Sequence, residues 1–437
     1  MNDDREVLLK VENLCKFFKM GNRELKAVNN VSFDIKKGEV FGLVGESGCG
    51  KTTTGRTIIK LYEPTGGNVW FKGRRIVAGT RSYKDEIEAK KEWCKKECAA
   101  MKTEAAEKIK AIPEGASDEE KKNETEKIKA ELKQKISEAV TETGEFVSEK
   151  RKEMRLAAYE DKNCDKLYAN ERVKEIQNEY AARIAKESDE TKKSELVAEC
   201  KKEVNKAKET RLVTQIQMIF QDPIASLDPR MTVRDIIAEG LIIRGEKDQK
   251  VINEKVYEML ELVGLVREHA DRYPHEFSGG QRQRIGVARA IIMNPEMIIA
   301  DEPVSALDVS IQAQVINLLN ALREKFKLTI LFVAHDLSVV KYFSDRIGVM
   351  YYGNMVEMAT SDELFAHPLH PYTKSLLSAI PLPDPVYERT RKRITYNPLA
   401  EHDYSLEKPT MREVSEGHFV YCNSEEEARY KALLAEK

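Results

Sequence analysis

The sequence predicts an α/β fold with a parallel sheet at its centre, into which an all-helical segment is inserted. Three short apolar runs predict buried strands, and polar or glycine-rich residues follow each run. A glycine-rich loop follows the first run and opens a helix, an arrangement that holds phosphates. The charged middle of the chain has few prolines and glycines, which is typical of exposed helices.

The composition excludes several classes of protein. The 437 residues suffice for about two or three domains, and a net charge of -2 gives no basis for binding nucleic acid or an anionic membrane. No run reaches the ~18 apolar residues of a membrane span, and the N-terminus MNDDREVLLK is too acidic for a signal peptide. The seven dispersed cysteines favour reduced thiols in a cytoplasm. Any membrane role is therefore expected to come through partner proteins.

Changes in composition divide the chain into four segments. Residues 1–79 and 211–360 have the texture of a globular core, with apolar runs punctuated by glycine and proline. Residues 80–210 are rich in Lys, Glu and Ala. Residues 361–437 form a C-terminal extension whose last part is polar, apart from a short amphipathic stretch from Glu425 to Leu434.

Apolar stripes predict how residues 80–210 fold. Each stripe recurs at steps of three or four residues and marks one face of a helix. A break at Pro113–Gly115 and a turn near Gly144 would separate the helices of an antiparallel hairpin or small bundle. A charged, partly disordered linker is the alternative. The stripe residues are Ile128, Leu132, Ile136 and Val140, and then Val173, Ile176, Tyr180 and Ile184.

The apolar run Val40–Val44 leads into a loop of the pattern GxxxxGK[ST]. Its glycines let backbone N–H groups turn toward phosphate oxygens, and the helix that starts near Lys51 adds its positive end. The Lys51 ammonium would contact the β- and γ-phosphates, and the Thr52 hydroxyl would ligate Mg²⁺. A chance glycine-rich turn is the alternative, which the flanking strand and helix disfavour. The predicted nucleotide-binding residues here are Gly45, Glu46, Ser47, Gly48, Cys49, Gly50, Lys51, Thr52 and Thr53.

A second apolar run, Met297–Ala300, ends in two carboxylates. Asp301 can hold Mg²⁺ through water, and the adjacent Glu302 can polarise an attacking water. In isolation, the alternative is structural, with one carboxylate exposed and the other capping a turn.

Two further polar residues follow apolar runs. His335 follows Leu328–Ala334, so it can reach a γ-phosphate if this strand lies beside the other two. Gln221 follows Met218–Phe220, and its amide can reach Mg²⁺ and the water. Neither residue alone would indicate a functional site, because an isolated His or Gln usually has a structural role.

The order of these motifs resembles that of ABC ATPases. The sequence Phe277–Gln281, FSGGQ, resembles their signature, although the usual first residue is leucine, and Ser305–Asp308 resembles their D-loop. His335 matches the switch histidine and Gln221 the Q-loop. The resemblance implies a P-loop NTPase fold with a RecA-like parallel core, an antiparallel β subdomain and an ABC helical subdomain. It implies ATP hydrolysis, with ATP and Mg²⁺ as cofactors.

The resemblance also implies how the site is completed. Two such domains pair head to tail, and the signature of one acts on the ATP held by the other. Asp308 would lie at that dimer interface, Phe18 would stack on adenine, and Phe17 is the competing choice, unless both are core residues. The signature residues expected to act on the partner's ATP are Ser278, Gly279, Gly280 and Gln281. The residues expected to serve Mg²⁺ are Thr52, Gln221 and Asp301.

Finer resemblance points to one branch, the second ATPase subunit of oligopeptide and dipeptide importers. It is carried by Gln217–Pro223, Ser226–Thr232, Tyr273–Phe277, residues 301–315 and His367–Thr373. It implies a sister ATPase subunit, two membrane permeases, an extracytoplasmic peptide-binding protein and a place on the cytoplasmic face of the membrane. Peptides, dipeptides, nickel or small glycosides are possible cargo for this branch.

The alternative from another class is a soluble ABC protein acting on ribosomes or DNA. Such proteins usually have two cores or very long coiled coils. This chain has one core and an insertion that is not basic, so we expect no nucleic-acid partner.

The cysteines raise three further expectations. Some peptide-importer ATPases hold an iron–sulfur centre in a C-terminal cysteine cluster, but this extension offers only Cys422, so we expect no such cluster. Cys94 and Cys98, four residues apart, could share a metal with outside ligands, although a structural role is favoured. Cys49 stands at a helix N-terminus, which can lower a thiol pKa and make the ATPase sensitive to thiol reagents.

Overall fold

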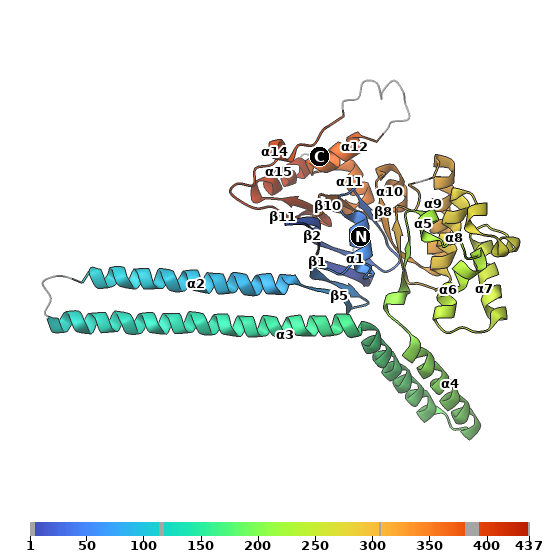
Figure 1. Ribbon diagram of the computed structural model, residues 1–437, viewed down its shortest axis with the longest axis horizontal. Helices are drawn as coiled ribbons and strands as arrows, with labels where there is room; N and C mark the ends of the chain where they lie inside the picture. The colour runs from blue at the N-terminus through green and yellow to red at the C-terminus, as the bar shows by residue number, and fades with distance from the viewer. Residues whose placement is uncertain (1–4, 113–117, 306, 381–392, 436–437) are drawn as a thin grey trace.

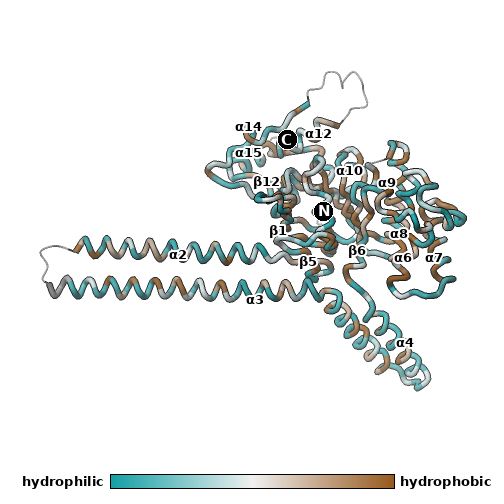
Figure 2. The backbone as a smooth tube through the Cα atoms, in the orientation of Figure 1, coloured by the Kyte–Doolittle hydropathy of each residue, from teal (hydrophilic) through white to brown (hydrophobic). Residues whose placement is uncertain are grey.

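The computed structural model describes residues 5–112, 118–305, 307–380 and 393–435. Two sheets and their covering helices form a core, from which long helices project (Figure 1). Most of the apolar colour in Figure 2 lies in the core, whereas the projecting helices are mainly hydrophilic. Within the described ranges, none of the helices combines the length and apolar character that a membrane span requires.

The smaller sheet has four antiparallel strands in the order β2-β1-β4-β5. Alternate side chains of its first strand, such as Leu9 and Val11, are buried against the larger sheet, as expected for a sheet with one face on a core. Its strands are β1 (Val7–Met20), β2 (Arg23–Lys36), β4 (Gly66–Phe71) and β5 (Arg74–Thr80).

The larger sheet has eight strands in the order β11-β12-β10-β9-β3-β8-β7-β6. The pairs from β9 to β6 are parallel, whereas β10, β11 and β12 join antiparallel. Every residue of β3, β7 and β8 is buried, because this part of the sheet is covered on both faces. The strands are β3 (Val40–Val44), β6 (Ile216–Ile219), β7 (Met297–Asp301), β8 (Thr329–Ala334), β9 (Arg346–Tyr351), β10 (Asn354–Thr360), β11 (Thr410–Ser415) and β12 (His418–Cys422).

The predicted α/β fold class is confirmed, including the parallel order of the three strands that precede the candidate site residues. The division into four segments, 1–79, 80–210, 211–360 and 361–437, stays a prediction. The helices around the sheets are α1 (Lys51–Ile58), α5 (Pro223–Ser226), α6 (Val233–Ile243), α7 (Gln249–Leu262), α8 (Gly279–Ile291), α9 (Val309–Phe326), α10 (Leu337–Phe343), α11 (Ser361–Ala366), α12 (Pro371–Ser378), α14 (Pro398–Glu401) and α15 (Ser424–Ala435).

The inserted segment is helical rather than a disordered linker. It consists of α2 (Arg81–Lys110), α3 (Asp118–Lys186) and α4 (Glu190–Glu209). Figure 1 shows two antiparallel pairs that project from the core in different directions, α2 with the first part of α3, and the last part of α3 with α4. The predicted break at Pro113–Gly115 lies outside the described residues.

The predicted turn near Gly144 is wrong, because α3 continues through this residue. A helical glycine costs about 1 kcal/mol relative to alanine, which the seam with α2 outweighs. In that seam, Cys94 donates to the Ala139 carbonyl, and Lys150 pairs with Glu86.

The middle of α3 packs on the core and joins the two pairs. Ala157 is fully buried, and Tyr168 lies under the cations of Lys72 and Arg74. Arg75 forms an ion pair of 3.0 Å with Glu160 at the edge of the smaller sheet. The insertion therefore packs on the core through the middle of α3, while the far tips of its two helical pairs project (Figure 1).

The C-terminal residues contain structure that their polar composition did not indicate. Strands β11 and β12 form a hairpin that extends the larger sheet through β10. The predicted amphipathic stretch 425–434 is confirmed as α15, whose Tyr430 is buried with Val420.

Candidate functional site

The glycine-rich loop lies between β3 and α1 and wraps around the Lys51 ammonium. Lys51 is 3% exposed, and its Nζ donates to the carbonyls of Gly45 and Glu46 at 2.7 and 2.9 Å. Gly50 has φ of 108°, and an added Cβ there would lie 2.1 Å from the Ala27 carbonyl oxygen. Only glycine fits this position, which begins a helix whose N–H groups face an incoming anion.

A carboxylate and a hydroxyl meet beside this loop. The Thr52 hydroxyl donates to Asp301 Oδ1 at 2.7 Å, and Arg56 Nη2 lies 3.8 Å from Asp301 Oδ2. Burial raises the pKa of Asp301, while the Thr52 hydrogen bond and the Arg56 charge act to lower it.

The same pair fits a magnesium ion. Asp301 Oδ2 is buried and accepts no hydrogen bond from the described residues, so it has lone pairs to offer. Hydroxyl and carboxylate oxygens are the donors that Mg²⁺ prefers. The oxygens of Thr52 and Asp301 therefore suit the predicted role of these residues.

Two further candidates, Gln221 and His335, converge on the carboxylate of Glu302. Gln221 Nε2 donates to Glu302 Oε2 at 2.9 Å, and His335 Nδ1 lies 3.3 Å from the same oxygen. Glu302 has φ of 44°, a left-handed conformation that is strained for a residue with a side chain. Its N–H donates to the Val333 carbonyl at 2.9 Å, so the neighbouring strand β8 holds it in this conformation.

The adenine candidates Phe18 and Phe17 lie in different surroundings. Phe18 meets Tyr62 edge to face at 5.6 Å, and Lys16 lies 4.9 Å from its ring centroid. Phe17 instead lies under the cations of Lys26 and Arg81. Tyr62 follows α1, so Phe18 is the one linked to the phosphate-loop helix, and its stacking role stays a prediction.

The signature residues form an exposed helix start. Ser278 caps α8 by accepting from the Gln281 N–H, and Gln281 Oε1 accepts from the Ser278 N–H. A Cβ on Gly280 would lie 2.6 Å from Ile311 Cγ2, whereas Gly279 meets only ordinary contacts. Asp308 is exposed and caps α9. The roles of these residues toward a partner's ATP stay predictions.

Sequence reasoning missed one contact with the phosphate loop. The Glu46 N–H donates to the hydroxyl of Tyr372 at 3.1 Å, across 326 positions of the chain. Tyr372 belongs to the stretch His367–Thr373, which the sequence marks as distinctive but does not place beside the loop.

The lowered pKa predicted for Cys49 is wrong. The thiol is 5% exposed, and burial raises its pKa despite the nearby Lys51 charge. Cys94 and Cys98 bring their sulfurs within 4.0 Å. In the part of the chain that the structure describes, no group of three or more His, Cys, Asp or Glu residues has metal-binding geometry.

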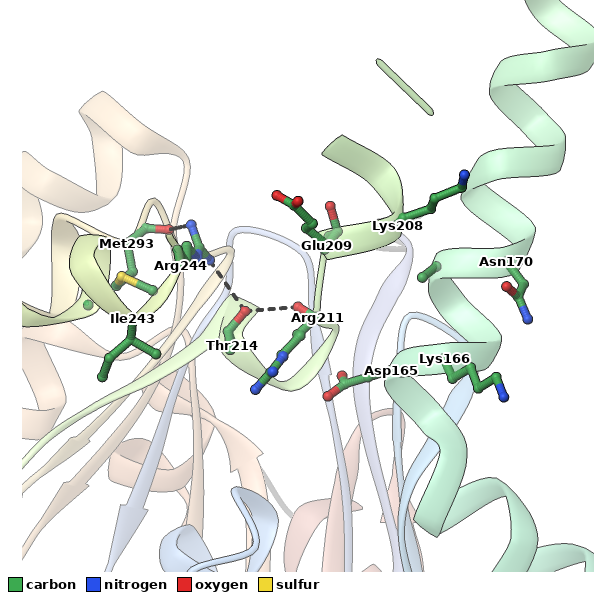
Figure 3. Close-up of a pocket in the computed structure, with 13 residues that line it drawn as sticks. Asp165, Lys166, Asn170, Lys208, Glu209, Arg211, Thr214, Ile243, Arg244 and Met293 are labelled. Carbon is green, nitrogen blue, oxygen red and sulfur yellow. Dashed lines mark hydrogen bonds between the residues drawn. The ribbon is translucent and has the colours of Figure 1, made fainter. Parts of the chain in front are cut away.

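A cavity of about 590 Å³ lies between part of the insertion and the core (Figure 3). Asp165 and Asn170 of α3 lie on one side and Ile243 and Met293 on the other. Arg244, at the end of α6, donates to the carbonyl of Met293, which follows α8, at 3.0 Å. It also donates to the Thr214 hydroxyl at 3.3 Å.

An adjoining groove of about 390 Å³ shares Ile243 and Met293 with this cavity and runs along β6. Its apolar lining includes Leu61 and Phe220. Leu61 is 54% and Ile243 74% exposed, so both offer apolar surface to a partner.

Two protein-family models match this chain. The family model described as ABC transporter matches residues 28–174 and 181–305, and the model described as oligopeptide/dipeptide transporter, C-terminal region, matches residues 356–405.

Curated relatives match over nearly the whole chain. The oligopeptide transport ATP-binding protein OppF of Bacillus subtilis is 43% identical, over 98% of this chain and 99% of its own length. The protein of the same name from Streptococcus mutans is 40% identical, over 99% of each chain. The dipeptide transport ATP-binding protein DppF of Lactococcus lactis is 39% identical, over 99% of this chain and 98% of its own.

Proposed function

The chain belongs to the ABC transporter family, in the branch with the oligopeptide/dipeptide C-terminal region, and from this premise we propose that it is the ATP-hydrolysing subunit of a peptide importer. The observation that carries the proposal is the convergence of Gln221 and His335 on Glu302, next to the Thr52–Asp301 pair. This arrangement has the parts needed to bind a triphosphate and to direct a water at it.

The phosphate loop binds the nucleotide. When the nucleotide binds, the Lys51 ammonium leaves the carbonyls of Gly45 and Glu46 and donates to phosphate oxygens instead. The negative charge of these oxygens makes the new hydrogen bonds stronger. The N–H groups at the start of α1 face the same phosphates. Thr52 and Asp301 would hold Mg²⁺, which would neutralise charge on the phosphates. Phe18 stacks on the adenine.

Glu302 orients and polarises the attacking water. Gln221 holds one Glu302 oxygen and so fixes the direction in which the other points. His335 lies within 3.3 Å of the same oxygen, from which its ring reaches the γ-phosphate by rotation. The strained backbone of Glu302 keeps the carboxylate at the strand edge, where a substrate can reach it.

A second ATPase subunit completes the site. The exposed N-terminus of α8, with Ser278 and Gly279, faces outward and suits an anion held by another chain. Asp308 at the start of α9 lies on the same exposed region, which would become the dimer interface. Closure of the dimer on ATP and its opening after hydrolysis provide the motion that drives transport.

Partners supply the membrane path. Two permease subunits hold the chain at the cytoplasmic face of the membrane, and an extracytoplasmic protein delivers the peptide. The groove with Leu61, Phe220 and Ile243 receives a short permease helix, because it offers apolar surface and includes Phe220, the residue before Gln221. The insertion forms the far wall of the adjoining cavity, so its middle lies close to this contact (Figure 3).

The test is uptake of labelled peptides by cells that lack the chain. The wild type restores uptake of an oligopeptide or dipeptide, and Lys51→Ala, produced at the same level, does not. Restored uptake of nickel or a glycoside, with none of either peptide, would overturn the peptide assignment. Full uptake with Lys51→Ala would overturn the role of the ATP site.

A further inference from the structure

The stretch that begins α12 touches the phosphate loop. The hydroxyl of Tyr372 accepts the Glu46 N–H at 3.1 Å, and the Tyr372 side chain is 1% exposed. In the same loop segment, Lys51 Nζ donates to the carbonyls of Gly45 and Glu46. The first turn of the loop is therefore held through a backbone N–H by Tyr372 and through two carbonyls by Lys51.

Tyr372 is itself anchored by the C-terminal region. The buried carboxylate of Glu357 accepts from the N–H groups of Leu369 and His370 at 2.8 and 3.1 Å, and from His418 Nε2 at 2.8 Å. The His370 side chain caps α12 by accepting from the Tyr372 N–H at 3.1 Å. Strands β10 and β12 thus fix the position from which the Tyr372 ring reaches the loop.

The residues around Tyr372 hold its ring in place and keep its hydroxyl protonated. The Tyr372 ring packs on Tyr351 and Tyr396, with centroids 4.4 and 5.6 Å away. Burial raises the pKa of Tyr372, so the phenol stays protonated at physiological pH and accepts the Glu46 N–H throughout. Packing alone would require only an aromatic ring at this position. The hydroxyl group is needed for the hydrogen bond with the Glu46 N–H of the phosphate loop.

We propose that Tyr372 is a positioning residue for the nucleotide site, through which the C-terminal region sets the affinity for ATP. This inference rests on the proposed function, since it takes the loop to be the ATP site. When Lys51 turns to phosphate, it releases the Gly45 and Glu46 carbonyls, while Tyr372 still holds the Glu46 N–H. The hydroxyl therefore contributes more in the bound loop than in the empty one.

The test compares Tyr372→Phe with the wild type in Mg·ATP binding and steady-state hydrolysis. We expect the KM and Kd for ATP to rise about three- to tenfold, the effect of one hydrogen bond, with kcat changed less than twofold. Tyr396→Phe is the matched control, since it removes a hydroxyl from the same cluster without touching the loop. Unchanged affinity in Tyr372→Phe, or an equal loss in both variants, would overturn the proposal.

Hydrogen exchange of the nucleotide-free protein gives a second readout, which does not depend on ATP binding. The Glu46 amide is expected to exchange slowly, and to exchange faster in Tyr372→Phe at equal thermal stability. Fast exchange of this amide in the folded wild type would overturn the proposal. A wild type that neither binds nor hydrolyses ATP would instead count against the proposed function, so the two failures are distinguishable.

Discussion

Gln221 donates a hydrogen bond of 2.9 Å to Glu302, although 81 positions separate them. One residue follows β6 and the other follows β7, and these strands are parallel neighbours. Parallel strands end at the same edge, so the sheet itself brings the amide to the carboxylate. His335 follows the next strand, β8, and reaches the same oxygen.

Replacing Glu302 with Gln tests the role of its charge. The amide keeps the shape of the side chain but cannot polarise water, so we expect hydrolysis to fall by about 10²- to 10⁴-fold. ATP binding should remain, and ATP-trapped dimers should accumulate during size-exclusion chromatography. Glu324→Gln, a change of the same chemistry at an exposed site on α9, should hydrolyse ATP at the normal rate. A Glu302→Gln protein with ordinary turnover would rule out this carboxylate.

Asp301→Asn should separate stability from activity. Burial raises the pKa of Asp301, which means that the charged form costs free energy in the empty site. An acid with a raised folded pKa loses stability as the pH rises from its unfolded pKa of about 3.9 through the folded value. Asn carries no charge, so the nucleotide-free variant should melt at a higher temperature at pH 7 while Mg²⁺-dependent hydrolysis is lost. A lower melting temperature at pH 7 would contradict this account.

His418 should make the C-terminal hairpin sensitive to alkaline pH. Burial acts to lower the pKa of His418, but the carboxylates of Glu357 and Glu363 outweigh it and raise the pKa above its ordinary value. The stabilisation is fully present below the unfolded pKa of about 6.5 and is lost as the pH rises through the folded value. The difference in melting temperature between wild type and His418→Gln should therefore shrink from pH 6 to pH 9. A constant difference would show that only packing is lost.

The sequence could indicate the candidate site residues at the strand ends because each one lies at or just after the end of an apolar run. Each strand ends in its functional residue, and the alternation of apolar runs and polar ends survives in the fold, as with Asp301 after Met297–Ala300. Contacts across long separations were not predictable, and Tyr372 with Glu46 is the main example. The hairpin β11–β12 was missed because its strands are short and partly polar.

The apolar stripes of the insertion were only partly predictable. Val173, Ile176, Tyr180 and Ile184 are all half-buried, as expected of a stripe, whereas Val140 is 53% exposed. Steps of four residues overshoot a helical turn by about 40° each, so three steps from Ile128 rotate Val140 out of the seam. Ala139, 7% exposed, takes its place against α2.

The projecting end of the first helical pair should be dispensable for folding. We expect a protein in which a short glycine-rich linker replaces residues 95–138 to keep its melting temperature and ATPase rate, because Cys94 and Ala139 face each other across the seam. In contrast, Ala157→Leu overfills the fully buried contact of α3 with the core and should cost about 1–3 kcal/mol. Denaturant unfolding measures both. A large loss of stability in the shortened protein would show that the distal helices support the core.

The last prediction concerns Cys49, whose side chain faces inward although its backbone forms part of the phosphate loop. The thiol is 5% exposed and its pKa is raised by burial, so little thiolate is present at neutral pH. We expect a thiol reagent to modify Cys49 slowly in the folded protein and faster after unfolding. Mass spectrometry measures both rates. Cys49→Ser should label with the same fast phase as the wild type and should hydrolyse ATP at a similar rate. Rapid modification of Cys49 that ATP prevents and Cys49→Ser abolishes would show instead that the loop opens enough to expose the thiol when nucleotide is absent.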